Sequence, residues 1–339
     1  MANLSKIDVV IPLFNAADYI GHAINSALRQ TLQPRLIIVV DDCSTDNSAS
    51  IVRSFIKKNP NILYFKTDKN SGPSKARNIG IKNSTASYIA FLDADDLWAP
   101  TKLFKQYEVF TKSSFGNDLA LVYTNCEDLD ASGSIIANGG AFELKRNLKG
   151  DVFSQLKNGN LISGSASGAL IKRTCIDNVG FFDETLEACE DWDLWLRISK
   201  KYKVDYVNEK LVYIRRHLAN SQWDSSRMLS GHLKFHSKLY ISKNLTFRRA
   251  MSLRANIFRY SFSINNIYEL FRLAIKPNQT RNVIKRNLER NSGWRSEQCN
   301  SKFKKYLISL YFFTPLLAYL LLHSFIYTLK AKFKKKVLS

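Results

Sequence analysis

Short apolar runs alternate with amphipathic stretches through the first part of the chain. The apolar runs are rich in β-branched residues and end at polar or turn-forming residues; they cover 9–13, 36–40, 62–65 and 88–92. The stretches between them carry apolar residues at helical spacing and cover 17–29, 51–55 and 74–82. Strands that alternate with helices in this way predict an α/β fold built on a mostly parallel sheet with flanking helices.

The pattern is mixed farther along the chain. We expect a helix after Pro100, a strand near 120–123, a Gly/Ser-rich loop at 163–168, a helix at 191–201 and a strand at 204–214. Beyond about residue 225 the sequence becomes basic and amphipathic. This change predicts a globular domain at 1–225 and a helical C-terminal region at 226–339.

Acidic residues follow two of the predicted strands. Asp41 and Asp42 close the second apolar run, and Asp93, Asp95 and Asp96 follow the fourth. Three carboxylates this close repel one another unless a cation lies between them, and a divalent cation bridges carboxylate to phosphate oxygens. The alternative interpretation is a solvated acidic turn before the next helix.

A second acidic motif lies at the start of a predicted helix, in Glu190-Asp191-Trp192-Asp193-Leu194-Trp195. Carboxylates stabilise a helix start through the free N–H groups and the dipole. A carboxylate between tryptophans is also typical of a sugar site, where an indole packs on the ring and the carboxylate takes a hydroxyl proton. Both interpretations remain open from these residues alone.

A third motif is the Gly/Ser loop 71–74, which opens a helix bearing Lys75 and Arg77. Helix N-termini bind anions, and arginine binds phosphate with a fixed fork. An ordinary helix start with exposed cations is the alternative interpretation.

Taken together, these motifs resemble the family 2 glycosyltransferases of the GT-A fold. The resemblance runs through 10–15, 39–46, 77–80, 92–96 and 190–192, and it covers about residues 7–220. One departure is Cys43, which stands where the family usually has glycine. The resemblance implies an inverting transfer of a sugar from a nucleotide-sugar donor to an acceptor hydroxyl.

The resemblance also implies a role for each matching residue. Asp191 is expected to be the catalytic base, with Glu190 beside it orienting the acceptor. The residues expected to bind the nucleotide sugar are Pro12, Asp41, Asp42, Arg77, Asp93, Asp95, Arg216 and His217. Asp95 and His217 are expected to ligate Mn²⁺ or Mg²⁺, and Trp192 and Trp195 to contact the acceptor. A surface histidine after a strand is the alternative interpretation of His217.

The substrate expectations follow from the same resemblance. The donor is expected to be a UDP-sugar, most narrowly UDP-glucose used to form a β-1,3 linkage. The acceptor is expected to be lipid-linked, such as undecaprenyl-diphosphate oligosaccharide in bacterial O-antigen or surface polysaccharide assembly. Lipopolysaccharide-core or capsule synthesis with another UDP-hexose is the alternative. Processive synthases of the family carry a Q-x-x-R-W motif, which this sequence lacks, so we expect one sugar per encounter.

The distribution of charge points to a membrane surface. Residues 240–339 carry 20 of the 50 lysine and arginine residues but only 3 of the 29 acidic ones. Within them, 306–329 has no formal charge, a length that permits a membrane span. Basic residues on both flanks oppose translocation, and Pro315 divides the run. We therefore expect an interfacial or re-entrant anchor on the cytoplasmic face of the bacterial inner membrane; a single span and a buried core helix are the alternatives.

A different class of function is a non-catalytic scaffold that binds membrane or nucleic acid. The basic tail is compatible with RNA, but the sequence has no RNA-binding module and its aromatic residues lie in a lipid-like run. We expect no nucleic-acid partner. The five scattered cysteines show no C-x-x-C pair, which argues against a disulfide framework or a zinc site and suits a reducing cytosol.

Overall fold

The computed structural model describes residues 6–136, 147–217 and 225–241, all of which belong to one compact unit. The predicted anchor at 306–329 lies outside the described residues, as does most of the predicted C-terminal region. Among the helices within these ranges, none is both long enough and apolar enough to cross a membrane.

The first part of the chain has the predicted alternation of strands and helices. Its elements are β1 (Ile7–Leu13), α1 (Ala17–Leu28), β2 (Leu36–Asp41), α2 (Ser48–Ile56), β3 (Ile62–Lys66), α3 (Pro73–Lys82) and β4 (Tyr88–Phe91). β1 pairs in parallel with β2 and β4, and β2 pairs in parallel with β3. The α/β prediction is therefore confirmed, and the carboxyl ends of these strands meet at one edge of the sheet.

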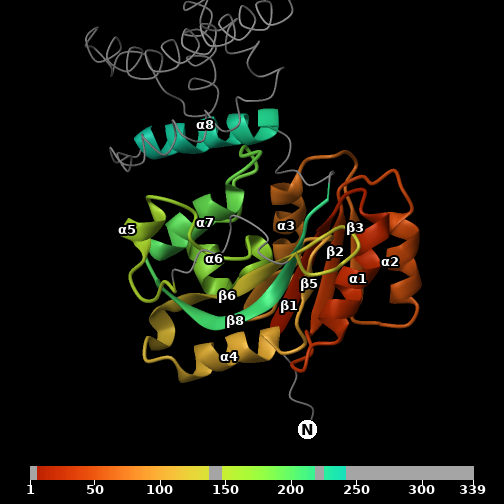
Figure 1. Cartoon of the computed structure of the whole chain (residues 1–339), viewed down its shortest axis with the longest axis horizontal. Coiled ribbons are helices and arrows are strands. Elements are labelled where there is room, and N and C mark those ends of the chain that lie inside the picture. Colours follow the sequence, from red (N-terminus) through yellow and green to blue (C-terminus); the bar gives the residue numbers. More distant parts are fainter. Residues whose placement is uncertain (1–5, 137–146, 218–224, 242–339) are drawn as a thin grey trace, which may run out of the picture. The chain divides into compact units, whose positions relative to one another are not determined.

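The second part completes the sheet with strands in both directions. Its elements are β5 (Leu97–Trp98), α4 (Lys102–Lys112), β6 (Leu119–Leu129), α5 (Phe153–Leu156), β7 (Leu170–Lys172), α6 (Arg173–Val179), α7 (Glu190–Ser199) and β8 (Lys203–Arg215). The sheet, which lies across the middle of Figure 1, has eight strands in the order β3-β2-β1-β4-β7-β6-β8-β5. Strand β7 runs antiparallel to both β4 and β6. β5 and β7 are too short to leave a periodic pattern in the sequence.

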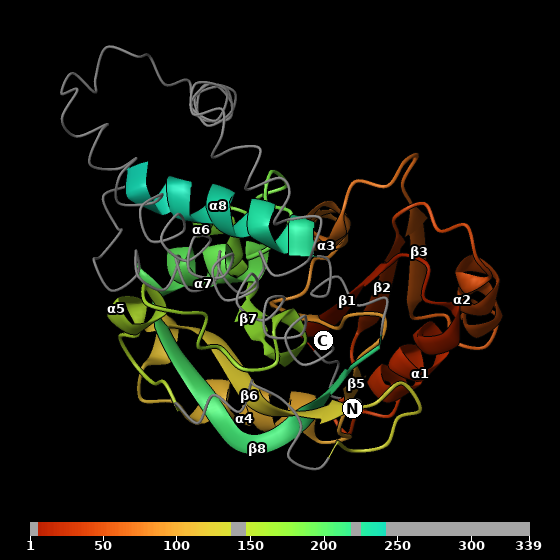
Figure 2. The ribbon, with the colours of Figure 1, turned by 45° about the horizontal axis from the view of Figure 1, so that its top comes forward.

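Two hydrophobic cores lie on opposite faces of the sheet, because successive side chains of a strand alternate between its faces. Val10 and Ile38 pack with residues of α3 and α7, whereas Val9 and Ile37 pack with residues of α1 and α4. Figure 2 shows α3 and α1 on opposite sides of β1 and β2. Gly80 permits the close approach of α3, since a Cβ there would lie 2.3 Å from Cγ1 of Val10.

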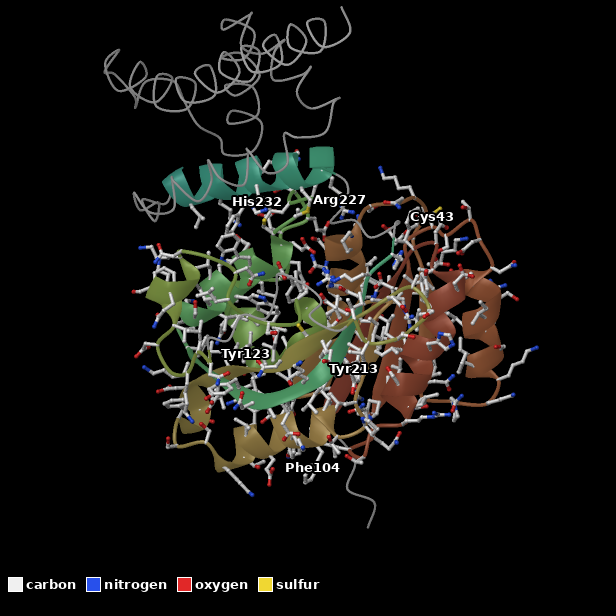
Figure 3. The ribbon with its side chains drawn as sticks, in the orientation of Figure 1. Cys43, Phe104, Tyr123, Tyr213, Arg227 and His232 are labelled. Atoms are coloured by element: carbon white, nitrogen blue, oxygen red, sulfur yellow. The ribbon has the colours of Figure 1, made fainter. Side chains whose placement is uncertain are left out.

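Helix α8 (Ser225–Ile241) packs against the segment that leads into α7. The Phe235 ring is buried, with its centroid 4.6 Å from that of Trp192. A Cβ on Gly231 would lie 2.5 Å from Cβ of Ala188, so the helix reaches the backbone of that segment. His232, labelled on α8 in Figure 3, lies 3.5 Å from Sγ of Cys189 through Nδ1. The start of α7 is thus covered by a helix that follows β8 in sequence.

Candidate active site

The predicted site residues lie where the fold brings strand ends and helix starts together. They belong to the end of β1 (Pro12), the end of β2 and the turn after it (Asp41, Asp42), the segment after β4 (Asp93, Asp95), helix α3 (Arg77), the start of α7 (Glu190, Asp191) and the segment after β8 (Arg216, His217). In a sheet of this kind, ligands bind outside the carboxyl ends of the parallel strands.

The two carboxylates after β2 hold the adjacent turns in place. Asp41 is buried and accepts hydrogen bonds from the Ser44 N–H at 2.7 Å and the Tyr64 hydroxyl at 2.6 Å. Asp42 is also buried and accepts the Gly72 N–H at 2.6 Å, which fixes the loop before α3. Both carboxylates therefore shape the mouth of the site, and their contact with a nucleotide base stays a prediction.

Cys43 lies in the same turn (Figure 3), and its backbone adopts a φ of +67°. A left-handed conformation costs a residue with a Cβ roughly 1–2 kcal/mol, whereas glycine adopts it freely. Cysteine at the position of the family's usual glycine therefore strains the backbone locally, in a turn whose conformation suits glycine.

We expect Cys43→Gly to raise the free energy of unfolding by up to about 1 kcal/mol, because relief of the strain exceeds the extra backbone entropy that glycine loses on folding. Urea denaturation of this variant and of Cys43→Ala tests the expectation, since alanine keeps the strain and removes only the thiol. A glycine variant less stable than the alanine variant would show that the conformation at this position costs nothing.

Arg77 joins the two acidic motifs. Its buried guanidinium donates through Nη2 to Asp93 at 2.7 Å and through Nη1 to Glu190 at 2.9 Å. Burial alone lowers the pKa of Arg77, but the negative charges of Asp93 and Glu190 outweigh it and raise that pKa. A permanent positive charge thus lies between a carboxylate after β4 and one on α7. The predicted contact of Arg77 with the base or diphosphate is untested.

Asp95 and His217, the two predicted metal ligands, lie side by side. Nε2 of His217 is 3.0 Å from Oδ2 of Asp95, and the His217 ring centroid is 4.7 Å from that of Tyr19. Nε of Arg215 donates to the backbone carbonyl of Asp95 at 3.1 Å. Burial and the charge of Asp93 raise the pKa of Asp95, and the hydrogen bond with His217 opposes that rise.

This pair fits a divalent cation that shares its ligands with the substrate. Mg²⁺ is usually held by one or two carboxylates together with substrate phosphates and water, and imidazole suits transition metals. Within the described ranges, no group of three or more His, Cys, Asp and Glu side chains is placed to hold a metal ion. Asp95 and His217 are thus the described residues that would hold such a cation, for which substrate phosphates and water are the usual further ligands.

Asp96, the third carboxylate of this segment, has a structural role. It is buried and accepts the Ser167 hydroxyl at 2.7 Å and the Arg215 N–H at 3.2 Å. The pKa of Asp96 is raised well above its ordinary value, mainly by burial and to a lesser degree by the charges of Asp95 and Asp93. Asp96 thus fastens the acidic segment to the end of β8.

Asp191, the predicted base, is 8% exposed at the start of α7. Its Oδ2 accepts hydrogen bonds from Nδ2 of Asn160 and the Ser165 hydroxyl, both at 3.2 Å, and its Oδ1 accepts the Trp192 N–H at 2.6 Å. Burial and the charge of Glu190 raise the pKa of Asp191 to about 6, against the lowering effect of these hydrogen bonds and of Arg77. A carboxylate with a pKa close to neutral pH suits general-base catalysis.

The structure corrects the role expected of the tryptophans. Trp192 is 4% exposed and donates from Nε1 to the Leu156 carbonyl at 2.8 Å, and Trp195 is fully buried. Both rings pack in the core between the sheet and α8. Because neither ring presents a face to solvent, their role is to fix α7 and not to stack on an acceptor sugar.

The remaining predicted residues lie at the margin of the site. Pro12 lies next to Val40 in the parallel register of β1 and β2. Arg216 follows β8, and its Nη2 donates to Oδ1 of Asp128 at 2.7 Å. Their predicted contacts with the nucleotide sugar stay predictions.

Sequence reasoning missed several residues that hold the site together. They are Tyr19, Asn160, Ser165 and Ser167, whose contacts are described above. The only signal for any of them was the density of glycine and serine at 163–168, which indicated a loop but not what it touches.

Comparison with known proteins identifies the family. The family model described as "Glycosyl transferase family 2" matches residues 8–180. The chain belongs to this family, as its strand-end carboxylates and mixed sheet indicated.

Related sequences come from several bacteria. An uncharacterized glycosyltransferase of Rickettsia typhi is 33% identical over 217 residues, which cover 63% of this chain and 65% of that protein. A putative teichuronic acid biosynthesis glycosyltransferase of Bacillus subtilis, TuaG, is 38% identical over 108 residues, covering 32% of this chain and 43% of that protein. The match spans only 29% of an uncharacterized glycosyltransferase of Rickettsia bellii, at 31% identity.

Solved structures share the fold at low sequence identity. Residues 1–349 of Staphylococcus aureus TarS in complex with UDP-GlcNAc match with a TM-score of 0.54 and 19% identity, over 84% of this chain and 81% of that one. A mannosyltransferase of Pyrobaculum calidifontis in complex with GDP-Man and Mn²⁺ matches with a TM-score of 0.51 and 17% identity, over 84% of each chain. At these identities the likeness concerns the GT-A fold.

Proposed function

We propose that this glycosyltransferase moves a hexose from a UDP-sugar to a lipid-linked acceptor, with inversion at the anomeric carbon and with the help of a divalent cation. The observation that carries the proposal is that the Arg77 guanidinium forms ion pairs with both Asp93 and Glu190. It therefore joins a residue proposed to bind the donor sugar to a residue proposed to orient the acceptor. Asp191 follows Glu190 directly, so the proposed base lies next to the proposed donor site.

The arrangement suits a single displacement. Asp191 removes the proton from the acceptor hydroxyl, whose oxygen attacks the anomeric carbon while the bond to the nucleoside diphosphate breaks on the opposite face. An α-linked donor then gives a β-linked product. Asp95 and His217 would hold Mn²⁺ or Mg²⁺, which offsets the charge that develops on the departing diphosphate.

Comparisons support the choice of donor class, and the sequence supports the acceptor class. TarS has been solved with UDP-GlcNAc, and TuaG is named for teichuronic acid biosynthesis. We retain UDP-glucose and a β-1,3 linkage as the narrowest proposal, with UDP-GlcNAc as the competing donor. A lipid-linked acceptor such as undecaprenyl-diphosphate oligosaccharide, used at the cytoplasmic face of the inner membrane, rests on the basic tail and the uncharged run 306–329.

The direct test is a panel of UDP-hexoses and GDP-mannose, supplied with a lipid-diphosphate saccharide, in which release of the nucleoside diphosphate is measured. We expect turnover with at least one UDP-hexose and a product of inverted configuration by NMR. Turnover only with GDP-mannose would overturn the donor class, and a product of retained configuration would overturn the mechanism.

We expect Asp95→Ala to abolish transfer, since the cation would lose its carboxylate ligand. We also expect EDTA to abolish wild-type transfer until Mn²⁺ or Mg²⁺ is restored. Asp118→Ala is a suitable control, because Asp118 lies in the turn Gly116–Asp118, away from the site. Full wild-type turnover in EDTA would refute the metal-dependent mechanism.

A further inference from the structure

Ser165 has a backbone conformation that glycine adopts readily and serine does not. Its φ is +51° and its ψ is −146°. That region of the Ramachandran map is almost exclusive to glycine, and other residues incur a cost in it unless the surrounding structure enforces it. Strain of this kind clusters at functional sites, so the contacts of Ser165 indicate what it serves.

The loop around Ser165 is closed tightly on itself. The Gly168 N–H donates to the Gly164 carbonyl at 2.8 Å, and a Cβ on Gly168 would lie 2.3 Å from the Ser163 carbonyl oxygen. Ser165 is exposed, whereas the residues on both sides of it are buried. The loop therefore presents one side chain outward and has little freedom to relax.

The same loop touches both halves of the site. The Ser167 hydroxyl accepts the Asp93 N–H at 3.0 Å and donates to Asp96 at 2.7 Å. Two positions earlier, the Ser165 hydroxyl donates to Oδ2 of Asp191 at 3.2 Å. The loop is thus anchored on the acidic segment after β4, and from that anchor it reaches the carboxylate at the start of α7.

We propose that Ser165 is a positioning residue that orients the Asp191 carboxylate toward the acceptor, with Asn160 as its partner on the same oxygen. The proposal rests on the proposed role of Asp191 as the base. Hydrogen bonds from Ser165 and Asn160 to Oδ2, together with the Trp192 N–H on Oδ1, fix the rotation of the carboxylate. A carboxylate held by these three hydrogen bonds points one of its remaining lone pairs toward the acceptor proton. The strain at Ser165 is then the cost of holding a hydroxyl at that point.

Two substitutions separate the hydroxyl from the strain. Ser165→Ala removes the hydroxyl and keeps the strained Cβ, whereas Ser165→Gly removes both. We expect both variants to lower kcat about ten- to a hundredfold, the range for loss of a hydrogen bond to a charged group, with little change in the KM for the UDP-hexose. We expect Ser165→Gly also to raise Tm above that of wild type, because glycine adopts the backbone conformation without strain.

The pH profile gives a readout that a merely structural role would not change. Asp191 also faces Glu190 on its own helix and Arg77 on α3, and neither is altered in these variants. Loss of the hydrogen bond that Ser165 donates to the ionised Asp191 carboxylate should raise the pKa of Asp191. The acidic limb of the kcat/KM profile should therefore move to higher pH in both variants. Ser163→Ala is the matched control, since the Ser163 hydroxyl contacts Cys126 Sγ at 3.3 Å instead of Asp191; its kcat and pH profile should stay at wild-type values.

The test is steady-state release of UDP from the best UDP-hexose of the panel, measured from pH 5 to pH 9, together with thermal unfolding. A Ser165→Gly variant with higher Tm, unchanged kcat and an unchanged pH profile would overturn the proposal. If Asp191→Asn is inactive while both Ser165 variants behave as wild type, only this inference fails. If Asp191→Asn retains its activity, the base assignment itself fails.

Discussion

Asp191→Asn is expected to lower turnover about 10²–10⁴-fold, the range for loss of a general base, and to stabilise the folded protein. The two effects share one cause, which is the burial of a carboxylate beside Glu190. Asparagine keeps the shape and an oxygen that accepts from Asn160 and Ser165, but it has no basicity and no charge to bury. Its amide nitrogen takes the place of Oδ1, which accepts the Trp192 N–H, and the loss of that hydrogen bond offsets part of the gain in stability.

The sign of the stability effect follows from the pKa. In the fold the pKa of Asp191 is about 6, above its ordinary 3.8, so the folded state binds the proton more tightly than the unfolded state does. The stabilisation from that proton is fully present below pH 3.8 and is lost as pH rises through about 6. At pH 7 the ionised carboxylate therefore costs the fold up to about 3 kcal/mol, of which the asparagine variant should recover a part.

Urea denaturation at pH 5 and pH 7 and steady-state kinetics test both effects together. The stability advantage of Asp191→Asn should be larger at pH 7. Asp193→Asn on the same helix is the matched control: Asp193 is paired with Arg197 at 2.8 Å and with Lys238 at 2.6 Å, so its loss should destabilise the fold and leave the base in place. Turnover of Asp191→Asn within a factor of ten of wild type would show that another group takes the proton.

Arg77→Met is expected to abolish transfer and to destabilise the protein by about 3–5 kcal/mol, the usual range when one partner of a buried ion pair is removed. Methionine fills the space but leaves Asp93 and Glu190 without their shared cation. Arg77→Lys should also fail, because a single ammonium lacks the planar fork that reaches two carboxylates at once.

A double variant separates charge from shape. Arg77→Met combined with Glu190→Gln should recover part of the lost stability, since one of the two uncompensated charges is gone, without recovering turnover. Chemical denaturation of the two single variants and the double variant gives the coupling free energy between the residues. Additive losses of stability would mean that the Arg77–Glu190 contact carries no energy in solution.

The sequence predicted the first part of the fold well and the details of the site less well. Strands buried on both faces consist of nearly continuous apolar residues, so β1, β2 and β4 were evident, and so were the carboxylates that follow them. The partners of Arg77 were not, because a cation at the start of a helix is typical of a phosphate ligand. Its contact with Glu190 depends on how α7 packs against α3.

The errors and omissions have the same origin. In the sequence the tryptophans of α7 resemble an aromatic platform for a sugar, but in the fold both are buried in the core, with Trp192 packed against Phe235 of α8. Asn160 and Ser165 are small polar residues without a distinctive spacing, and only the closure of the loop brings them to Asp191. The boundary predicted near residue 225 stays a prediction.

The contact of Gly231 with Ala188 has a practical consequence for exchanging parts between relatives. The family model ends at residue 180, before both α7 and α8, and a chimera joined between these two helices, after β8, would take α7 from one parent and α8 from the other. Any side chain at the glycine position of the incoming helix would push on the residues just before Glu190, and a mismatched pair of helices would move the base while every catalytic residue was retained. Exchange of acceptor specificity should therefore transfer residues 181–241 as one block, with the junctions placed after Gly180 and after Ile241.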